Sequence, residues 1–197
     1  KRVTLELGGK NSTSVLDDAD LDVAASSAAW GAYLHQGQIC MATGTVLAQK
    51  KIARDLTERL VAKAKNLPVG DPSAGPCALG PIINGRQIER IDGIVRDAIA
   101  KGAVLRAGGT YDRLFYKPTV LEGVKPDMRV YSEEVFGPVL AVIEFDTDEE
   151  AIALSNRTEY GLSTGVITQS VERAMNFTAK LKTGIVHIND QTVSDEP

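Results

Sequence analysis

Residues 139–167, VLAVIEFDTDEEAIALSNRTEYGLSTGVI, decide the fold class. They open with the continuous apolar segment 139–145, which is typical of a strand buried inside a sheet. Residues 148–155 then predict a helix, because acidic side chains in its first turn suit the helix dipole. Residues 165–167 predict a further strand. This alternation of strand and helix is typical of α/β proteins with a largely parallel sheet.

The rest of the chain shows the same alternation. Short apolar segments predict strands at residues 3–7, 14–16, 45–48, 104–105, 119–121 and 184–188. Apolar residues near helical spacing, with capping and stop signals, predict helices at residues 20–34, 53–64, 86–101 and 170–181. Residues 66–85 are rich in Gly and Pro and predict a surface loop, and residues 35–43 form a second loop. We therefore expect a three-layer α/β/α fold with a mostly parallel sheet.

Composition excludes several classes of protein. The chain has 197 residues, of which 43% are hydrophobic and 24% charged, as is usual for a globular domain. A net charge of -4, with scattered Lys and Arg, does not favour nucleic acid or a membrane surface as partner. No apolar stretch approaches the roughly 20 residues of a membrane span, and no signal peptide opens the chain. Cys40 and Cys77 are the only cysteines, so we expect a reducing, cytoplasmic compartment.

The first motif with chemical potential is Glu6-Leu7-Gly8-Gly9-Lys10, at the end of the strand predicted at residues 3–7. A carboxylate beside a glycine pair can face a cleft in which backbone and ligand approach closely. The structural alternative is a strand-end glutamate in water. The pentapeptide alone does not decide between them.

The second motif is Gly37-Gln38-Ile39-Cys40, in the loop after the helix predicted at residues 20–34. A lone cysteine is more often a small core residue than a nucleophile. The thiolate is the reactive form of cysteine and needs help from its surroundings. The local sequence offers no obvious cationic neighbour, so both interpretations stay open at this point.

The third motif is EEVFGP, residues 133–138, which leads into the strand at residues 139–145. A structural turn explains the Gly-Pro pair but not an exposed phenylalanine beside it. A cofactor contact would explain it, with Glu134 on ribose hydroxyls and Phe136 on the nicotinamide side.

Together these motifs resemble those of the aldehyde dehydrogenase superfamily, in which a glutamate motif, a cysteine motif and a third motif occur in this order. Lesser matches lie at residues 17–21, 80–83, 160–163 and 184–186. The resemblance covers essentially the whole chain. It implies that residues 1–197 are the family's catalytic domain, with most of the cofactor-binding domain absent. The chain also starts and stops without a terminating element, which suggests a piece of a longer polypeptide.

The resemblance implies a mechanism. Cys40 attacks the aldehyde carbon to form a thiohemiacetal, hydride passes to NAD or NADP, and a thioester remains. Glu6 acts as general base for the water that hydrolyses the thioester to a carboxylic acid. The Cys40 backbone N–H supplies one oxyanion donor. The family's second oxyanion donor and most of its cofactor contacts lie upstream, and no Gly-rich dinucleotide turn is present. We therefore expect that residues 1–197 alone do not catalyse the reaction.

The resemblance also assigns residues around the ligands. Cofactor contacts are expected from Glu134, Phe136, Leu7 and Gly8, and substrate contacts from Ile39, Met41 and Asn189. The alternative for Asn189 is a strand-end turn residue. Residues 184–192 and 35–36 resemble the benzaldehyde and vanillin dehydrogenase branch, which implies an aromatic aldehyde as substrate. No metal site is expected, and the choice between NAD and NADP stays open.

Two alternatives remain. A CoA-acylating aldehyde dehydrogenase would pass the acyl group to CoA, although that class often lacks a glutamate at the position of Glu6. A non-catalytic relative, kept as a structural or binding protein, would not need both Glu6 and Cys40. Members of the family are dimers or tetramers in which a neighbour's β-hairpin extends the sheet. We therefore expect an open sheet edge here and a homodimer or homotetramer at full length.

Overall fold

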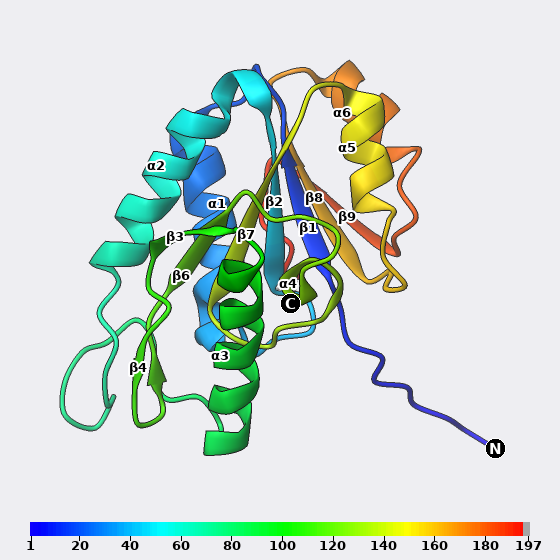
Figure 1. The fold of residues 1–197 in the computed structure, drawn as a ribbon. Helices are drawn as coiled ribbons and strands as arrows, with labels where there is room; N and C mark the ends of the chain where they lie inside the picture. The colour runs from blue at the N-terminus through cyan, green and yellow to red at the C-terminus, as the bar shows by residue number, and fades with distance from the viewer. Residues whose placement is uncertain (195–197) are drawn as a thin grey trace.

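Most strands of the chain form one large sheet. The computed structural model describes residues 1–194. Its strands are β1 (Asn11–Val15), β2 (Thr43–Gln49), β3 (Val104–Ala107), β4 (Tyr111–Asp112), β5 (Phe115–Tyr116), β6 (Thr119–Glu122), β7 (Val139–Phe145), β8 (Ser163–Ile167) and β9 (Ile185–Ile188). The seven-stranded sheet has the order β3-β6-β7-β2-β1-β8-β9, and its pairs are parallel except β3 with β6. The predicted α/β class is confirmed (Figure 1).

Helices cover both faces of this sheet. They are α1 (Leu21–Tyr33), α2 (Lys50–Asn66), α3 (Gly85–Ala100), α4 (Arg129–Ser132), α5 (Asp148–Ser155) and α6 (Val171–Thr178), with the short 3-10 segment η1 (Leu34–Gly37) after α1. Adjacent residues of one strand point to opposite faces. Val142 packs with α1 and α2, whereas Ala141 packs with α3. Val46 packs with α1 and α2, whereas Leu47 packs with α5 and α6. The predicted three layers are therefore confirmed.

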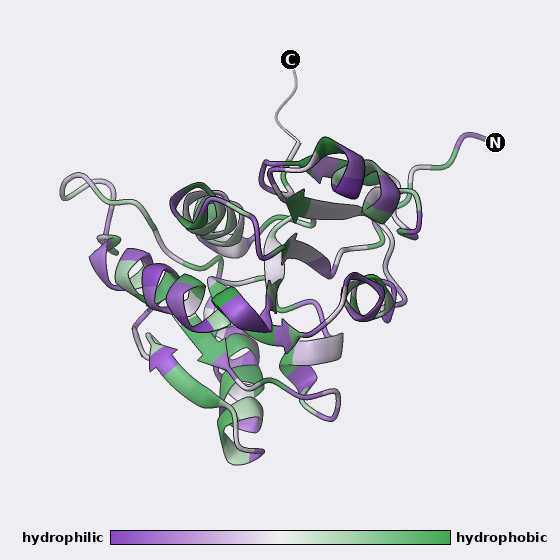
Figure 2. Ribbon diagram, turned by 90° about the horizontal axis from the view of Figure 1, so that it is seen from above, coloured by the Kyte–Doolittle hydropathy of each residue, from purple (hydrophilic) through white to green (hydrophobic). Residues whose placement is uncertain are grey.

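The helices are held to the sheet by apolar stripes. Figure 2 shows bands of hydrophobic and hydrophilic residues along the longer helices. In α2, for example, Leu56 and Leu60 are completely buried against the sheet. Burial of each such side chain contributes about 1.5–3 kcal/mol. Among residues 1–194, no helix is long and apolar enough to cross a bilayer.

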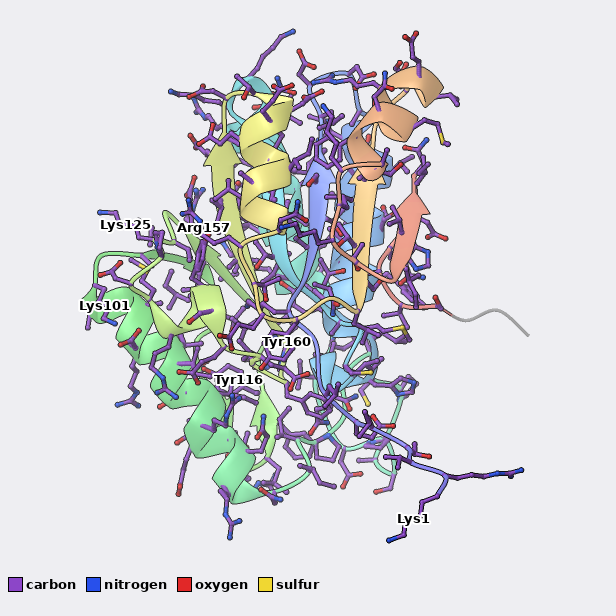
Figure 3. All side chains as sticks on the ribbon, turned by 90° about the vertical axis from the view of Figure 1, so that its right-hand side faces the viewer. Lys1, Lys101, Tyr116, Lys125, Arg157 and Tyr160 are labelled. Atoms are coloured by element: carbon purple, nitrogen blue, oxygen red, sulfur yellow. The ribbon has the colours of Figure 1, made fainter. Side chains whose placement is uncertain are left out.

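The prediction of a strand at residues 3–7 is wrong. Residues 1–10 form no regular secondary structure, and Val3, Leu5 and Leu7 have 75%, 68% and 75% of their surface exposed. A strand needs a neighbour for its backbone hydrogen bonds, and no strand within residues 1–194 pairs with this segment. Figures 1 and 3 show the segment leaving the body of the molecule, with Lys1 at its tip.

Smaller differences from the prediction have local causes. The helix predicted at residues 170–181 ends at Thr178, because Asn156 binds the residues that follow. Its amide donates to the Lys180 carbonyl at 2.9 Å and accepts from the Lys182 N–H at 2.7 Å. The strand predicted at residues 14–16 already begins at Asn11, which pairs with β2. The short elements α4, β4 and β5 have no counterpart among the predicted elements, since each is too short to show a period.

The sheet has the open edge that the sequence analysis expects. β9 is an outer strand and pairs, within the described residues, with β8 alone. Its other side therefore presents unpaired backbone groups. Val186 and Ile188 are 36% and 39% exposed, so apolar side chains accompany this edge.

Thr13 of β1 provides a test of how this core tolerates polar groups. Its hydroxyl is buried and has no hydrogen-bond partner within residues 1–194. Leaving a buried hydroxyl unsatisfied costs about 1–3 kcal/mol, and valine has a similar shape. We expect Thr13→Val to raise the free energy of unfolding by about 1 kcal/mol, measured by urea denaturation. A decrease in this free energy would contradict the absence of a partner.

Candidate active site

The sequence motifs come together because each precedes a strand. Residues 6–10 lead into β1, residues 37–40 lie shortly before β2, and residues 134–138 lead into β7. These strands are neighbours in the order β7-β2-β1, and they run parallel. Their amino ends therefore lie at the same edge of the sheet, and the motifs meet at that edge.

The glycines of the first motif contact the third motif. The Gly9 N–H donates to Glu134 Oε1 at 2.9 Å. Gly8 has a φ of +72°, a left-handed conformation that favours glycine. A Cβ at Gly8 would lie 2.8 Å from Glu134 Oε2, so a larger residue would crowd the carboxylate. The Glu134 side chain therefore lies directly against the backbone of the first motif.

Gly9 also contacts the cysteine motif. A Cβ at Gly9 would lie 2.0 Å from the carbonyl oxygen of Cys40, which no side chain can tolerate. Cys40 is half-buried and its thiol is free. The Ala42 N–H donates to the Ile39 carbonyl at 3.0 Å and closes a turn around Cys40. Within residues 1–194 no acceptor pairs with the Cys40 N–H.

α3 holds the third motif in place. Arg90 donates to the Glu134 carbonyl at 2.6 Å and to the Val135 carbonyl at 2.8 Å. Gln87 donates to the Phe136 carbonyl at 2.9 Å. Phe136 has a φ of +54°, which is unfavourable for a residue other than glycine, and it is 37% exposed. The loop therefore presents the aromatic ring to the surface.

A small cavity lies where the motifs meet. Its volume is about 20 Å³, and its lining includes Gly9, Gly37, Ile39, Glu134 and Phe136. This volume holds one water molecule and not an aldehyde. A larger ligand has to contact these residues from outside. An apolar cavity of about 630 Å³ lies between α1 and α2, but none of the motif residues lines it.

Lys10 buries its ammonium group beside this junction. Its Nζ has no hydrogen-bond partner within residues 1–194. Burial lowers the pKa of Lys10 from its usual 10.5 to about 8, whereas the charges of Glu134 and Glu133 act in the opposite direction. At neutral pH, Lys10 is therefore charged in a place that disfavours charge.

The predicted general base lies apart from these contacts. Glu6 and Leu7 are exposed on the irregular segment that precedes Gly8. Since the strand predicted here does not form, no packing against a neighbour fixes the Glu6 side chain. The structure thus brings together Gly8, Gly9, Glu134 and Cys40, but it does not place Glu6 among them. The roles of Glu6 and Leu7 stay predictions.

The candidate substrate contacts differ in their surroundings. Ile39 and Met41 flank Cys40 in its turn and are half-buried. Asn189 follows β9 with a φ of +59°, and its Oδ1 accepts from the Thr168 N–H at 2.9 Å. This contact fits the alternative of a strand-end turn residue, and the contact of Asn189 with substrate stays a prediction. Within the part of the chain that the structure describes, no group of His, Cys, Asp or Glu is arranged to hold a metal ion.

Two residues that contact the cysteine turn belong to none of the three motifs. Asn11 and Thr192 donate hydrogen bonds to carbonyls of this turn. They lie 29 and 151 residues from the carbonyls they bind. No local pattern could identify them, because only the fold brings these partners together.

The amino-acid sequence is similar to those of known proteins. All of residues 1–197 match the aldehyde dehydrogenase family. The chain is 50% identical over 196 residues to a vanillin dehydrogenase from Amycolatopsis sp.. It is 48% identical over 197 residues to an NAD(+) benzaldehyde dehydrogenase from Pseudomonas putida. Each match covers this whole chain and 40% of the relative, so the chain spans about two fifths of their length.

The fold is also similar to that of solved structures. A salicylaldehyde dehydrogenase from Pseudomonas putida G7, solved with salicylaldehyde, matches with a TM-score of 0.94 at 44% identity. The match covers 98% of this chain and 40% of that one.

Because Gly9 contacts Cys40, we expect one added methyl group at Gly9 to destabilise the fold. Gly9→Ala places that methyl on the Cys40 carbonyl oxygen, so the turn has to move. We expect the free energy of unfolding to fall by about 1–3 kcal/mol, as for other overpacked sites, measured by urea denaturation. Gly70→Ala is the matched control, because its Cβ would meet nothing within 4 Å. Equal stability of the two variants would show that Gly9 is not constrained.

Because Lys10 buries its charge, we expect the free energy of unfolding to depend on pH. The folded pKa of about 8 lies below the ordinary 10.5, so the unfolded chain binds the extra proton between these values. The free energy of unfolding of the wild type therefore rises with pH between about pH 8 and 10.5. Below pH 8, burial of the charged Lys10 lowers this free energy by its full amount. We expect Lys10→Met to be more stable than the wild type at pH 7 by on the order of 1–3 kcal/mol. Urea denaturation at increasing pH should show this advantage shrinking, and a constant advantage would be evidence against a titrating Lys10.

Proposed function

Because the chain belongs to the aldehyde dehydrogenase family, we propose that it performs the cysteine chemistry of an NAD(P)-dependent aldehyde oxidation. The product is a carboxylic acid, and the substrate is an aromatic aldehyde. The observation that best supports the chemistry is the meeting of the three motifs at the amino ends of β1, β2 and β7. The choice of an aromatic substrate is supported by relatives named for vanillin, benzaldehyde and salicylaldehyde.

Cys40 is the nucleophile in this proposal. Cys40 is half-buried on a turn beside the junction of the motifs, and the proposal has the aldehyde approach it from outside. The thiolate attacks the carbonyl carbon and forms a thiohemiacetal. The Cys40 N–H, which has no acceptor within residues 1–194, is available to stabilise the oxyanion. Loss of hydride from the former carbonyl carbon then leaves a thioester on Cys40.

The third motif fits a nicotinamide cofactor, NAD or NADP. Glu134 holds the Gly9 N–H with Oε1, while its Oε2 can accept from ribose hydroxyls. Phe136 exposes its ring beside it, as a surface for the nicotinamide side. Gly8 keeps the space next to the carboxylate free of side-chain atoms, and Leu7 is exposed beside it. When bound, the cofactor supplies the hydride acceptor.

Glu6 is the proposed general base of the hydrolysis step. Its carboxylate is exposed and lies two residues before Gly8, whose glycine backbone lets the segment change direction. In this role Glu6 takes a proton from the water that attacks the thioester carbonyl. Expulsion of the Cys40 thiolate releases the carboxylic acid and restores the nucleophile.

We also propose substrate contacts, an oligomeric state and a compartment for the enzyme. Ile39 and Met41 are proposed to contact the aldehyde, since they flank Cys40. We propose a homodimer or homotetramer, supported by the open edge of β9. The proposed compartment is the cytoplasm, where Cys40 stays a free thiol.

A hybrid enzyme tests this proposal. In the Pseudomonas putida benzaldehyde dehydrogenase, our chain replaces the segment that it matches over 197 residues. We expect the hybrid enzyme to convert benzaldehyde to benzoate with formation of NADH. Cys40→Ala should lower the rate by roughly 10³-fold or more. Glu6→Gln should still form NADH rapidly in the first turnover, and its steady-state rate should fall by about 10²–10⁴-fold, because hydrolysis is impaired.

Cys77→Ser is the control for the loss of a thiol, and we expect it to keep the wild-type rate. Benzoate formation that survives Cys40→Ala would contradict the assigned nucleophile. A folded hybrid enzyme that binds NAD+ but forms no benzoate would contradict the substrate class. Transfer of the acyl group to CoA in preference to water would favour the CoA-acylating alternative.

A further inference from the structure

The turn that carries Cys40 is held by two buried side chains outside the three motifs. The carbonyl oxygens of three successive residues accept their hydrogen bonds. Asn11 Nδ2 donates to the Cys40 oxygen at 2.8 Å and to the Ala42 oxygen at 3.0 Å. Thr192 Oγ1 donates to the Met41 oxygen between them at 2.7 Å. We call Asn11 and Thr192 the carbonyl clamp.

The carbonyl clamp has little freedom to rearrange. Asn11 is 2% exposed and Thr192 is completely buried. Both hydrogens of Asn11 Nδ2 bind the turn, and its Oδ1 accepts from the Ser163 N–H at 3.1 Å. The single hydroxyl proton of Thr192 goes to Met41, so Thr43 is the donor in the 2.8 Å contact between the two threonine hydroxyls. Breaking any of these bonds leaves a buried polar group unpaired.

The carbonyl clamp connects the turn to the neighbouring strand β1 and to the segment after β9, the outer strand. Asn11 begins β1, and Thr192 follows β9. Ser163, at the start of β8, joins the two, because its Oγ also donates to the Thr192 carbonyl at 2.6 Å. A turn that merely connects η1 to β2 does not need side-chain contacts from two other parts of the chain, themselves joined through β8. Their convergence indicates that the position of this turn matters.

Fixing these carbonyls restricts the Cys40 sulfur. The bond to the Cys40 oxygen sets the plane of the peptide that follows the cysteine, which leaves the thiol only its few side-chain rotamers. A displacement of about 1 Å in a reacting group can cost 10²-fold in rate. We propose that Asn11 and Thr192 are positioning residues that hold the Cys40 nucleophile. The proposal rests on the proposed function for the role of Cys40.

Matched substitutions separate positioning from general stability. Thr192→Val removes the hydroxyl and keeps the shape, whereas Thr192→Ser keeps the hydroxyl. Asn11→Ser keeps one hydroxyl donor that is too short to reach both carbonyls. Thr13→Val is the control, since it alters a buried threonine that takes no part in the carbonyl clamp.

The first measurement uses the chain itself and needs no activity. Hydrogen exchange of the Ala42 amide reports opening of the turn, because this N–H bonds to the Ile39 carbonyl. We expect Thr192→Val and Asn11→Ser to accelerate this exchange by about tenfold or more. Thr192→Ser and Thr13→Val should exchange at the wild-type rate. Equal exchange in all variants would overturn the claim that the carbonyl clamp holds the turn.

The second measurement uses the hybrid enzyme. We expect Thr192→Val and Asn11→Ser to lower kcat by about 10²-fold while KM for NAD+ is unchanged, with Thr192→Ser restoring kcat. A wild-type kcat in Thr192→Val, or an equal loss in Thr192→Ser, would overturn the positioning role. Should Thr192→Val not fold, Asn11→Ser decides in the same way. If the unaltered hybrid enzyme were inactive, the proposed function would fail, while the exchange measurement would still test the carbonyl clamp.

Discussion

The parallel pairing of β7, β2 and β1 is the constraint on which the candidate site depends. Strands that run in one direction present their amino ends at the same edge of the sheet. Segments 6–10, 37–40 and 134–138 enter these strands, so they become neighbours despite their distance in the sequence. Open α/β sheets commonly bind ligands at the carboxyl ends of their strands. This chain instead gathers its motifs at the amino ends, in the loops that lead into the strands.

Backbone contacts join the motifs. Of the buried polar groups around them, some stabilise the site and one destabilises it. Gly8 and Gly9 allow Glu134 and the Cys40 carbonyl to approach the main chain directly. Such contacts tolerate little added volume, because protein interiors are close-packed. Asn11 and Thr192 are buried with their hydrogen bonds satisfied, which makes them suitable supports for the Cys40 turn. Lys10 is buried without a hydrogen-bond partner in the described residues, so the same region also contains a group that costs stability.

Local patterns predict most of the fold. The apolar run of β7 and the acidic first turn of α5 give those elements the bounds that the structure has, because periodicity and capping act over a few residues. The same kind of pattern is misleading at Val3, Leu5 and Leu7. Their residue types suit a strand, but a strand also requires a partner, and none lies beside them in residues 1–194. Strand propensity is therefore a condition for β structure and not a sufficient one.

By itself, the sequence determined the order of helices and strands and the residues of the three motifs, because both are written in neighbouring positions of the chain. Only the tertiary structure decided that Gly9 touches both Cys40 and Glu134, that Asn11 and Thr192 hold the turn, and that Glu6 lies apart. These contacts join residues separated by up to 151 positions. They follow from the order of strands in the sheet, and local spacing contains no information about that order.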